Sequence, residues 1–485
     1  MSDANLLVLS PYMALAATAV VVMLVSTFYR WHPLSARLTA AGLVADFACV
    51  LVSAGAGDRR ATVLLRLDDF SLYFTGLLLF IALAVLAISY GYLRRSERRV
   101  GDFYTLLTLA TLGGVILLAS AHFASFFLGL EVLTVSLYGL IAYPRRRPQA
   151  IEAAIKYLVL AGTTSAFLLF GMALVYAVSG TMLLKGLATA GNGLIGWESA
   201  AYKAGLALIF TGVGFKLALA PFHLWTPDVY QGGPAPVTAF LATASKAAVF
   251  VVLLQFLSPL DPKHGGVLLV VFSIVGYASM LAGNLLALFQ QNLKRLLAYS
   301  SIAQLGYLTV ALIAAGTAGR TAVAFYLSVY SLALVAAFGV VAVLSREHGE
   351  PESISQFRGL GHRRPVLALV LTVAVLSLAG MPLTAGFIGK FFIFRAGADA
   401  SLWGLLVVLA LTSAMSLYYY LRVIVTMYRA DVEPFEVRLA ASNSPGGHDR
   451  LAVSAVALLS VLTVALGIYP TPLLRLIEQV TAALS

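Results

Sequence analysis

Long apolar runs constrain this chain more than any other feature of its sequence. About fourteen runs of roughly 20 apolar residues are separated by short polar segments. A helix of about 20 residues crosses the roughly 30 Å hydrocarbon core of a bilayer. The composition agrees, because 60% of the residues are hydrophobic and 11% are charged, against roughly 25% charged residues in soluble domains. We therefore expect an all-α polytopic membrane protein that forms a single membrane domain over residues 1–485.

The polar segments between the runs give the expected spans. The first run lacks the basic residues and the cleavage site of a signal peptide, so we expect a true helix there. The expected spans are 6–28, 35–54, 70–93, 103–120, 122–143, 151–179, 201–221, 235–257, 265–288, 298–316, 319–345, 365–395, 402–428 and 450–475.

Basic residues in the loops predict the orientation of the chain. Loops after odd-numbered spans, including the one with Lys294 and Arg295, hold roughly twice as many lysines and arginines as the other loops and the termini together. This excess places the odd loops in the cytoplasm and both termini on the opposite face. The same positions beside apolar runs explain the formal net charge of +11, so we expect a lipid bilayer and no nucleic acid as partner.

The single cysteine excludes several kinds of redox centre. Cys49 lies inside an apolar run, whereas iron–sulfur clusters and disulfides each require more than one cysteine. The sequence also has no CxxC motif, phosphate-binding loop or dinucleotide fingerprint. We expect no cofactor and no metal site in this chain.

Ionisable residues inside the apolar runs are the most informative residues. Each costs roughly 2.5–3.5 kcal/mol at a helix centre, so each requires a reason. Glu131 lies near the middle of its span, where it either bonds to Thr134 or Ser136 as a neutral group or carries a proton. Lys156 follows Glu152 by one helical turn, which favours a local ion pair with a structural or a functional role.

A lysine beside a helix break marks the seventh span. Lys216 precedes Pro221, which interrupts the helix because proline cannot donate a backbone hydrogen bond. At membrane depth, such a break is tolerated only inside protein or beside a water-filled cavity. His223 follows the break and either caps freed backbone groups or exchanges protons, since histidine titrates near pH 6.5.

A second break with a lysine follows in the twelfth span, where Lys390 comes after Pro382. Lys246 lies between the two breaks, in the eighth span, among small residues and the hydroxyls of Thr243 and Ser245. Its side chain either fills space between close helices or carries protons. The interrupted spans seven and twelve indicate an internal repeat of five helices, and paired discontinuous helices are typical of a transport pathway.

These residues together support a proton relay. Burial allows lysine and glutamate to exchange protons near neutral pH, and a neighbouring opposite charge reverses that effect. We expect the relay to run through Glu131, Lys216, Lys246 and Lys390 across the middle of the membrane, with water bridging the longer gaps. Asp46, in the second span, has no obvious local partner and is left out of the relay.

Five segments resemble one family over essentially the whole chain. The longest, FKLALAPFHLWTPDVYQGGPAPVTAFLATASKAAVF (215–250), is similar to the subunit N family of proton-pumping NADH:quinone oxidoreductase, complex I or NDH-1. The others are EVLTVSLYGLIAY (131–143), EAAIKYLVL (152–160), NLKRLLAYSSIAQLGYL (292–308) and AGMPLTAGFIGKFFIF (379–394). The resemblance implies fourteen transmembrane helices, with broken helices 7 and 12 and two inverted five-helix repeats, 103–257 and 265–428.

The resemblance also implies which residues carry protons. Positions matching the family's buried glutamate and lysines are Glu131, paired with Lys216, together with Lys156, Lys246 and Lys390. One position departs from the pattern: many relatives carry histidine where this chain has Gln304, and glutamine cannot take a proton at ordinary pH. The second half of the relay is therefore expected to depend on water or other side chains at that step.

As a function, the resemblance implies a proton-translocating subunit that couples quinone reduction elsewhere in the complex to proton transfer along these residues. NADH, FMN, iron–sulfur clusters and quinone would belong to partner subunits. The implied partners are M-type and K/J/A-type membrane neighbours and, indirectly, the peripheral redox arm. The implied location is the bacterial cytoplasmic (inner) membrane, with multiple spans and both termini on the periplasmic side.

Two other functions remain open. The first is a D-type subunit of a multi-subunit sodium/proton antiporter, which shares the broken helices and the lysine but has no redox partner. The second is a passive membrane scaffold, which explains the number of spans but not the ionisable residues along two broken helices.

Overall fold

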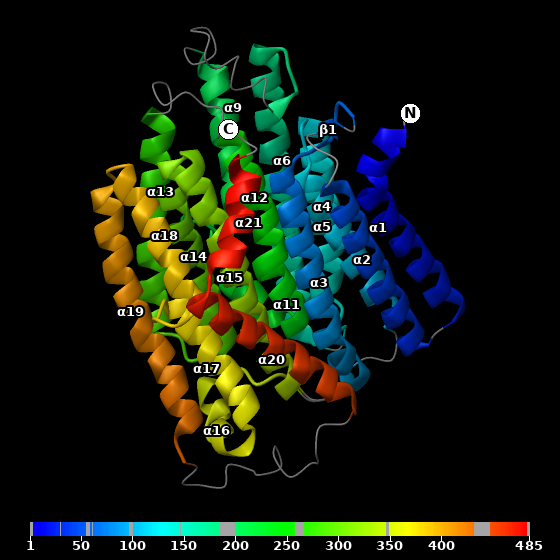
Figure 1. The fold of residues 1–485 in the computed structure, drawn as a ribbon, viewed down its shortest axis with the longest axis vertical. Helices are drawn as coiled ribbons and strands as arrows, with labels where there is room; N and C mark the ends of the chain where they lie inside the picture. The colour runs from blue at the N-terminus through cyan, green and yellow to red at the C-terminus, as the bar shows by residue number, and fades with distance from the viewer. Residues whose placement is uncertain are drawn as a thin grey trace.

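The protein is a bundle of long helices (Figure 1). The computed structural model describes residues 3–29, 31–54, 59–60, 62–96, 100–145, 147–184, 199–257, 266–345, 349–430 and 447–482. Within these residues, 13 helices are long and apolar enough to cross a membrane. The expected all-α polytopic membrane fold is therefore confirmed.

The elements follow one another along the chain with short connections. The helices are α1 (Asp3–Phe28), α2 (His32–Ala54), α3 (Asp69–Ser96), α4 (Gly101–Leu118), α5 (Phe123–Ile141), α6 (Pro148–Ser179), α9 (Ala200–Leu217), α10 (Trp225–Gly232), α11 (Ala235–Phe240), the π-helix η1 (Leu241–Ser245), α12 (Lys246–Leu257), α13 (Gly266–Leu288), α14 (Leu293–Ala314), α15 (Gly316–Leu344), the 3-10 helix η2 (Ile354–Phe357), α16 (Leu360–Arg363), α17 (Pro365–Ala379), α18 (Ala385–Asp399), α19 (Trp403–Tyr428), α20 (Gly447–Ile468) and α21 (Thr471–Ala482). Two short strands, β1 (Arg59–Arg60) and β2 (Arg66–Leu67), pair antiparallel.

Every expected span overlaps described helices, although several of the expected boundaries differ from the observed ones. The span 365–395 is divided between α17 and α18, which have 15 residues each and are too short to cross a roughly 30 Å core alone. The expected start of the second repeat, residue 265, lies outside the described residues. The inverted relation of the two repeats stays a prediction.

Two of the differences in the expected boundaries change the interpretation. α14 begins at Leu293 and not at 298, because the Asn292 side chain caps it and accepts from the backbone N–H groups of Lys294 and Arg295. These two basic residues therefore lie in the first turn of a helix and not in a loop. The last expected span, 450–475, is interrupted where α20 ends at Ile468 and α21 begins at Thr471.

The centre of the bundle consists of α12, α14 and α15, whose spans are almost completely buried. α1, α2, α6 and α20 are buried over a third of their spans or less, and their exposed side chains are mostly apolar. Such surfaces suit lipid or a neighbouring membrane protein. α4 and α5 approach so closely that a Cβ on Gly113 would lie 2.4 Å from the backbone nitrogen of Leu133.

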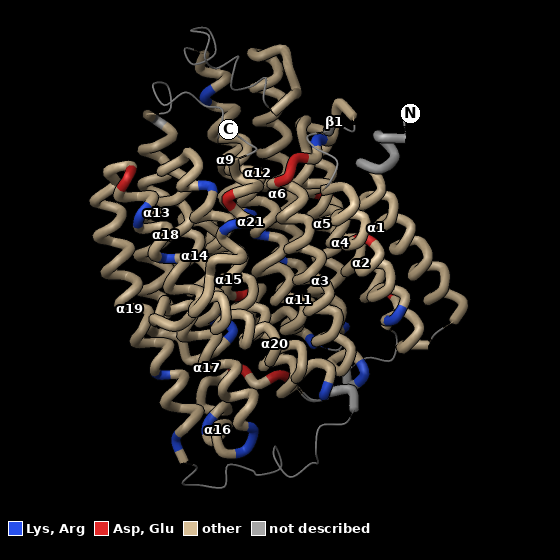
Figure 2. Tube along the Cα trace, viewed as in Figure 1, with Lys and Arg blue, Asp and Glu red and all other residues tan. Residues whose placement is uncertain are grey.

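Charged residues and chain ends follow the layout of a membrane protein. Most lysines and arginines lie toward the ends of the helices, and a smaller number lie at intermediate height (Figure 2). The beginning of α1 and the end of α21 both lie in the upper half of the view (Figure 1). The described chain thus enters and leaves the bundle on the same side, and the assignment of that side to the periplasm stays a prediction.

Candidate functional site

The first helix break lies between α9 and α10, as the sequence predicted from Pro221. Ala218 takes a left-handed conformation with φ of 58° and ends α9. The N–H of Ala220, freed by the break, donates to Ser279 Oγ on α13 at 2.9 Å. The freed N–H group is therefore hydrogen-bonded within the protein, as backbone groups at membrane depth require.

Lys216 lies in the last turn of α9, next to this break, with 6% of its surface exposed. Its Nζ donates to Thr134 Oγ1 on α5 at 2.7 Å, and it lies 5.7 Å from the centre of the Tyr157 ring. The Thr134 hydroxyl gives its own hydrogen to the Leu130 carbonyl at 2.6 Å. Thr134 therefore holds the ammonium in place through a lone pair.

Glu131 lies one helical turn before Thr134 on α5 and is half-buried. Its carboxylate accepts from Ser165 Oγ on α6 at 2.5 Å. The expected partners, Thr134 or Ser136, are wrong, because both hydroxyls donate to carbonyls of their own helix. Among the described residues, no ion pair within 4.0 Å joins Glu131 to Lys216. Lys216 reaches α5 at Thr134, three residues after Glu131, whereas Glu131 bonds to α6.

Lys246 begins α12, directly after the π-helix η1, and is 1% exposed. Its Nζ donates to Ser301 Oγ on α14 at 2.7 Å and lies 5.4 Å from the centre of the Tyr230 ring. π-Helical turns are rare and occur frequently at functional sites, because they redirect the side chains that follow. Lys246 therefore points across the buried centre of the bundle, toward α14.

The second helix break lies between α17 and α18 and contains Pro382. Lys390, on α18, reaches back across the break: its Nζ donates to the carbonyl of Ala379, the last residue of α17, at 2.9 Å. It also donates to Ser413 Oγ on α19 at 2.8 Å and lies 4.8 Å from the centre of the Tyr307 ring. Lys390 is 7% exposed.

The three buried lysines, Lys216, Lys246 and Lys390, thus share one kind of environment. Each donates to a hydroxyl of a neighbouring helix and lies near the face of a tyrosine ring. Within the described residues, none of them has a carboxylate within 4.0 Å. Neutral partners satisfy both the charged and the uncharged amine, so this environment allows a change of protonation state.

Lys156 is placed differently. The predicted ion pair with Glu152 is present at 2.8 Å, and Asp228 on α10 lies at the same distance. Arg295 in turn pairs with Asp228 at 2.7 Å. The Lys156 side chain is 43% exposed, so the structure does not bring it into the environment shared by the three buried lysines.

His223 lies inside the first break with 8% of its surface exposed. Its carbonyl accepts from the N–H of Thr226, which starts the next helical turn. Its Nδ1 and the hydroxyl of Thr226 are buried and have no hydrogen-bond partner among the residues that the structure describes. Such atoms are typical sites of bound water.

A buried ion pair that the sequence analysis missed joins Lys294 to Glu350 at 2.6 Å, with side chains 2% and 3% exposed. Glu350 also accepts from Tyr92 and from the N–H of Ala235, and Arg147 lies 3.6 Å from it. Burial raises the pKa of Glu350, but the charge of Lys294 and the hydrogen bonds outweigh burial and hold it below its usual value. Nothing in the sequence pointed to this pair: Lys294 lies two residues after Asn292, which caps α14, and far from Glu350 in the chain.

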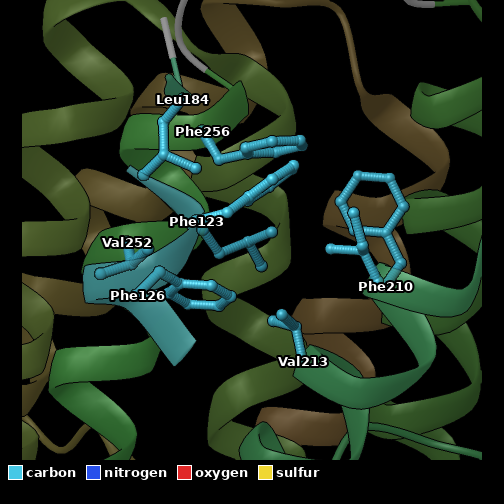
Figure 3. A pocket seen from close by; sticks show the side chains of 9 residues that line it. Phe123, Phe126, Leu184, Phe210, Val213, Val252 and Phe256 are labelled. Carbon is cyan, nitrogen blue, oxygen red and sulfur yellow. The ribbon is translucent and has the colours of Figure 1, made fainter. Parts of the chain in front are cut away.

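Two further features lie away from the lysines. Asp46 is completely buried, and in the described part of the chain neither of its carboxylate oxygens has a hydrogen-bond partner. A pocket between α5, α9 and α12 is lined only by apolar side chains, including Phe123, Phe126 and Phe210 (Figure 3), so it offers no group for proton chemistry. Within the described residues, no cluster of three or more His, Cys, Asp or Glu could hold a metal ion.

Comparison with known families agrees with this geometry. Residues 120–416 match the family described as "NADH:quinone oxidoreductase/Mrp antiporter, TM". The matched segment contains both helix breaks and all three buried lysines. The chain is also 44% identical over 478 residues to NADH-quinone oxidoreductase subunit N of Methylococcus capsulatus, covering 98% of this chain and 95% of that protein.

Solved structures share the fold. A chain of respiratory complex I from Thermus thermophilus superimposes with a TM-score of 0.81 at 37% identity, covering 96% of this chain and 98% of that chain. A chain of the Mrp complex from a Dietzia species superimposes with a TM-score of 0.85 at 21% identity, covering 99% and 97%. At that identity, the second likeness concerns the fold alone.

Proposed function

This chain belongs to the NADH:quinone oxidoreductase/Mrp antiporter family, and from that premise we propose that it is subunit N of a proton-translocating NADH-quinone oxidoreductase. The observation that carries the proposal is the set of three buried lysines, each held by a hydroxyl and not by a carboxylate. A passive scaffold has no need for three such charges, each of which is expensive inside a membrane.

In the proposed relay, Glu131, Lys216, Lys246 and Lys390 bind and release the proton in turn. Each lysine points an N–H at a hydroxyl, which fixes the direction of the side chain without trapping its proton. A carboxylate in the same place would hold the lysine in its charged form. Lys156 has two such carboxylates, so we assign it a charged position at the flank of the relay, with its proton retained.

The break between α9 and α10 supplies the proposed link to water. The unpaired atoms of His223 and Thr226 lie in the turn that follows Pro221. Water bound there would lie within the same break as Lys216. His223 is assigned the role of holding that water, and a direct part in proton transfer stays a prediction.

The decisive test is proton pumping by the assembled complex in membrane vesicles. Lys216→Ala is expected to remove most of the proton pumping that accompanies NADH oxidation, while the complex still assembles. Lys203→Ala is the matched control, because Lys203 lies on the exposed first turn of the same helix, α9. Wild-type pumping by an assembled Lys216→Ala complex would refute the proposal.

The partners and the location follow from the same proposal. We assign the chain to a bacterial cytoplasmic membrane, between other membrane subunits of the complex, with NADH, FMN, iron–sulfur clusters and quinone in partner subunits. The alternative, a sodium/proton antiporter subunit, predicts sodium-dependent transport without flavin-containing or iron–sulfur partners. Purification of the intact assembly and identification of its subunits distinguishes the two.

A further inference from the structure

Two tyrosines on α15 face the lysines of the second half of the relay. Tyr326 and Tyr330 are four residues apart, so they lie on the same face of their helix. Opposite them on α14, Ser301 and Gln304 are three residues apart and also share a face. Both tyrosines are 2% exposed. Each bonds to one of the two α14 residues, which forms a ladder of two rungs between the helices.

The first rung ends at Lys246. Ser301 Oγ lies 2.6 Å from the Tyr330 hydroxyl, which donates its hydrogen to the Ala242 carbonyl at 3.1 Å. Because that hydrogen is used, Tyr330 accepts from Ser301, and the lone pair of Ser301 is left for the ammonium of Lys246 at 2.7 Å. Ala242 belongs to the π-helix η1, so Tyr330 also fixes the turn from which Lys246 starts.

The second rung ends at Lys390. The Tyr326 hydroxyl donates to Gln304 Oε1, and Gln304 Nε2 donates to the Leu378 carbonyl at 2.9 Å. The next carbonyl along the chain, that of Ala379, accepts from Lys390 Nζ at 2.9 Å. Gln304 therefore fixes the end of α17, whose last carbonyl holds the lysine.

From this geometry we propose that Tyr326 and Tyr330 are positioning residues for proton transfer between Lys246 and Lys390. Each phenolic hydrogen ends on a carbonyl-type oxygen, of Gln304 or Ala242, so neither tyrosine passes a proton onward. The transferred proton moves past the ladder through water, and the ladder keeps both lysines aimed at that route. This inference rests on the proposed function. It assigns the side chains on which the second half of the relay depends at Gln304, where many relatives carry a histidine that could take a proton.

Phenylalanine variants of the assembled complex test the ladder. Tyr330→Phe frees the Ser301 hydrogen to turn toward Lys246, and Tyr326→Phe releases Gln304. Each variant is expected to lower the initial rate of proton pumping roughly three- to tenfold, the range for one buried hydrogen bond, and to shift the pH profile of pumping. Tyr73→Phe is the control, because the Tyr73 hydroxyl on α3 bonds to Ser328 on α15 at 2.7 Å and has no hydrogen bond to any lysine that the structure describes.

The isosteric variant Gln304→Met removes both bonds of the second rung and is expected to match Tyr326→Phe in pumping and in its pH profile. The ladder is overturned if Tyr326→Phe and Tyr330→Phe behave as Tyr73→Phe does while Lys246→Ala and Lys390→Ala stop pumping. If the two lysine variants pump at the wild-type rate, the proposed function itself fails, which is a separate outcome.

Discussion

The buried pair of Lys294 and Glu350 gives the sharpest prediction for stability. Glu350→Gln keeps the shape of the side chain but removes the charge that faces Lys294 Nζ at 2.6 Å. The Lys294 side chain is 2% exposed, so its charge stays buried, with the Gly233 carbonyl as its remaining strong acceptor. Removing one partner of such a pair costs about 3–5 kcal/mol. Because the pair is almost fully buried, solvent does not reduce this value.

The expected result is a complex that loses its assembled form at a clearly lower temperature than the wild type. The assay is heating of membranes in steps, followed by native gel electrophoresis of the solubilised complex. Glu478→Gln on α21 is the control, because Glu478 is exposed and surface substitutions usually change stability by less than about 0.5 kcal/mol.

The double variant Lys294→Met/Glu350→Gln separates a coupled pair from two independent losses. With both charges removed, no unpaired buried charge is left, so the double variant is expected to be more stable than Glu350→Gln alone. The reasoning about this pair is refuted if the double variant loses as much stability as Lys294→Met and Glu350→Gln together. It is also refuted if Glu350→Gln is as stable as Glu478→Gln.

Three further predictions follow from the structure. The pKa of Glu350 is below its usual value, so its stabilising contribution is complete above the unfolded pKa of about 4.3 and is lost as pH falls through the lower, folded value. Lys294→Met removes the charge that lowers this pKa, so the variant should lose less stability between neutral and acidic pH than the wild type does, measured as the disassembly temperature of the complex at each pH. Lys156→Ala should retain much more pumping than Lys216→Ala in the same vesicles, because Lys156 is 43% exposed and paired with carboxylates. Asp46→Leu should raise thermal stability by about 1–3 kcal/mol, since it removes a buried carboxyl without a partner; a loss of pumping in this variant would instead indicate that Asp46 carries protons.

The features that sequence analysis recovered depend on local rules. Proline removes a backbone donor and bends or breaks a helix, and further prolines or glycines lie near both Pro221 and Pro382, so the two breaks could be predicted without knowing the packing. The buried lysines could be recognised because a charge within an apolar run is rare. The ion pair of Lys156 with Glu152 follows from their spacing along one helix.

The features that were missed depend on contacts between distant helices. Glu350 is 56 residues from Lys294 in the chain, and nothing near either residue indicates that they pair. The hydroxyl partners Ser165 and Ser301 could not be chosen among the many hydroxyls of the spans. The exposure of Lys156 could not be predicted either, because lipid-facing and protein-facing surfaces of a membrane helix are both apolar.

The π-helix η1 makes the position of Lys246 sensitive to chain length. A π-turn holds one more residue than an α-turn, and each residue of an α-helix rotates the chain by about 100°. Removing a single residue from η1 would restore regular α-helix and swing Lys246 about a quarter of a turn away from Ser301. In this segment the number of residues, and not only their identity, determines where the central charge points.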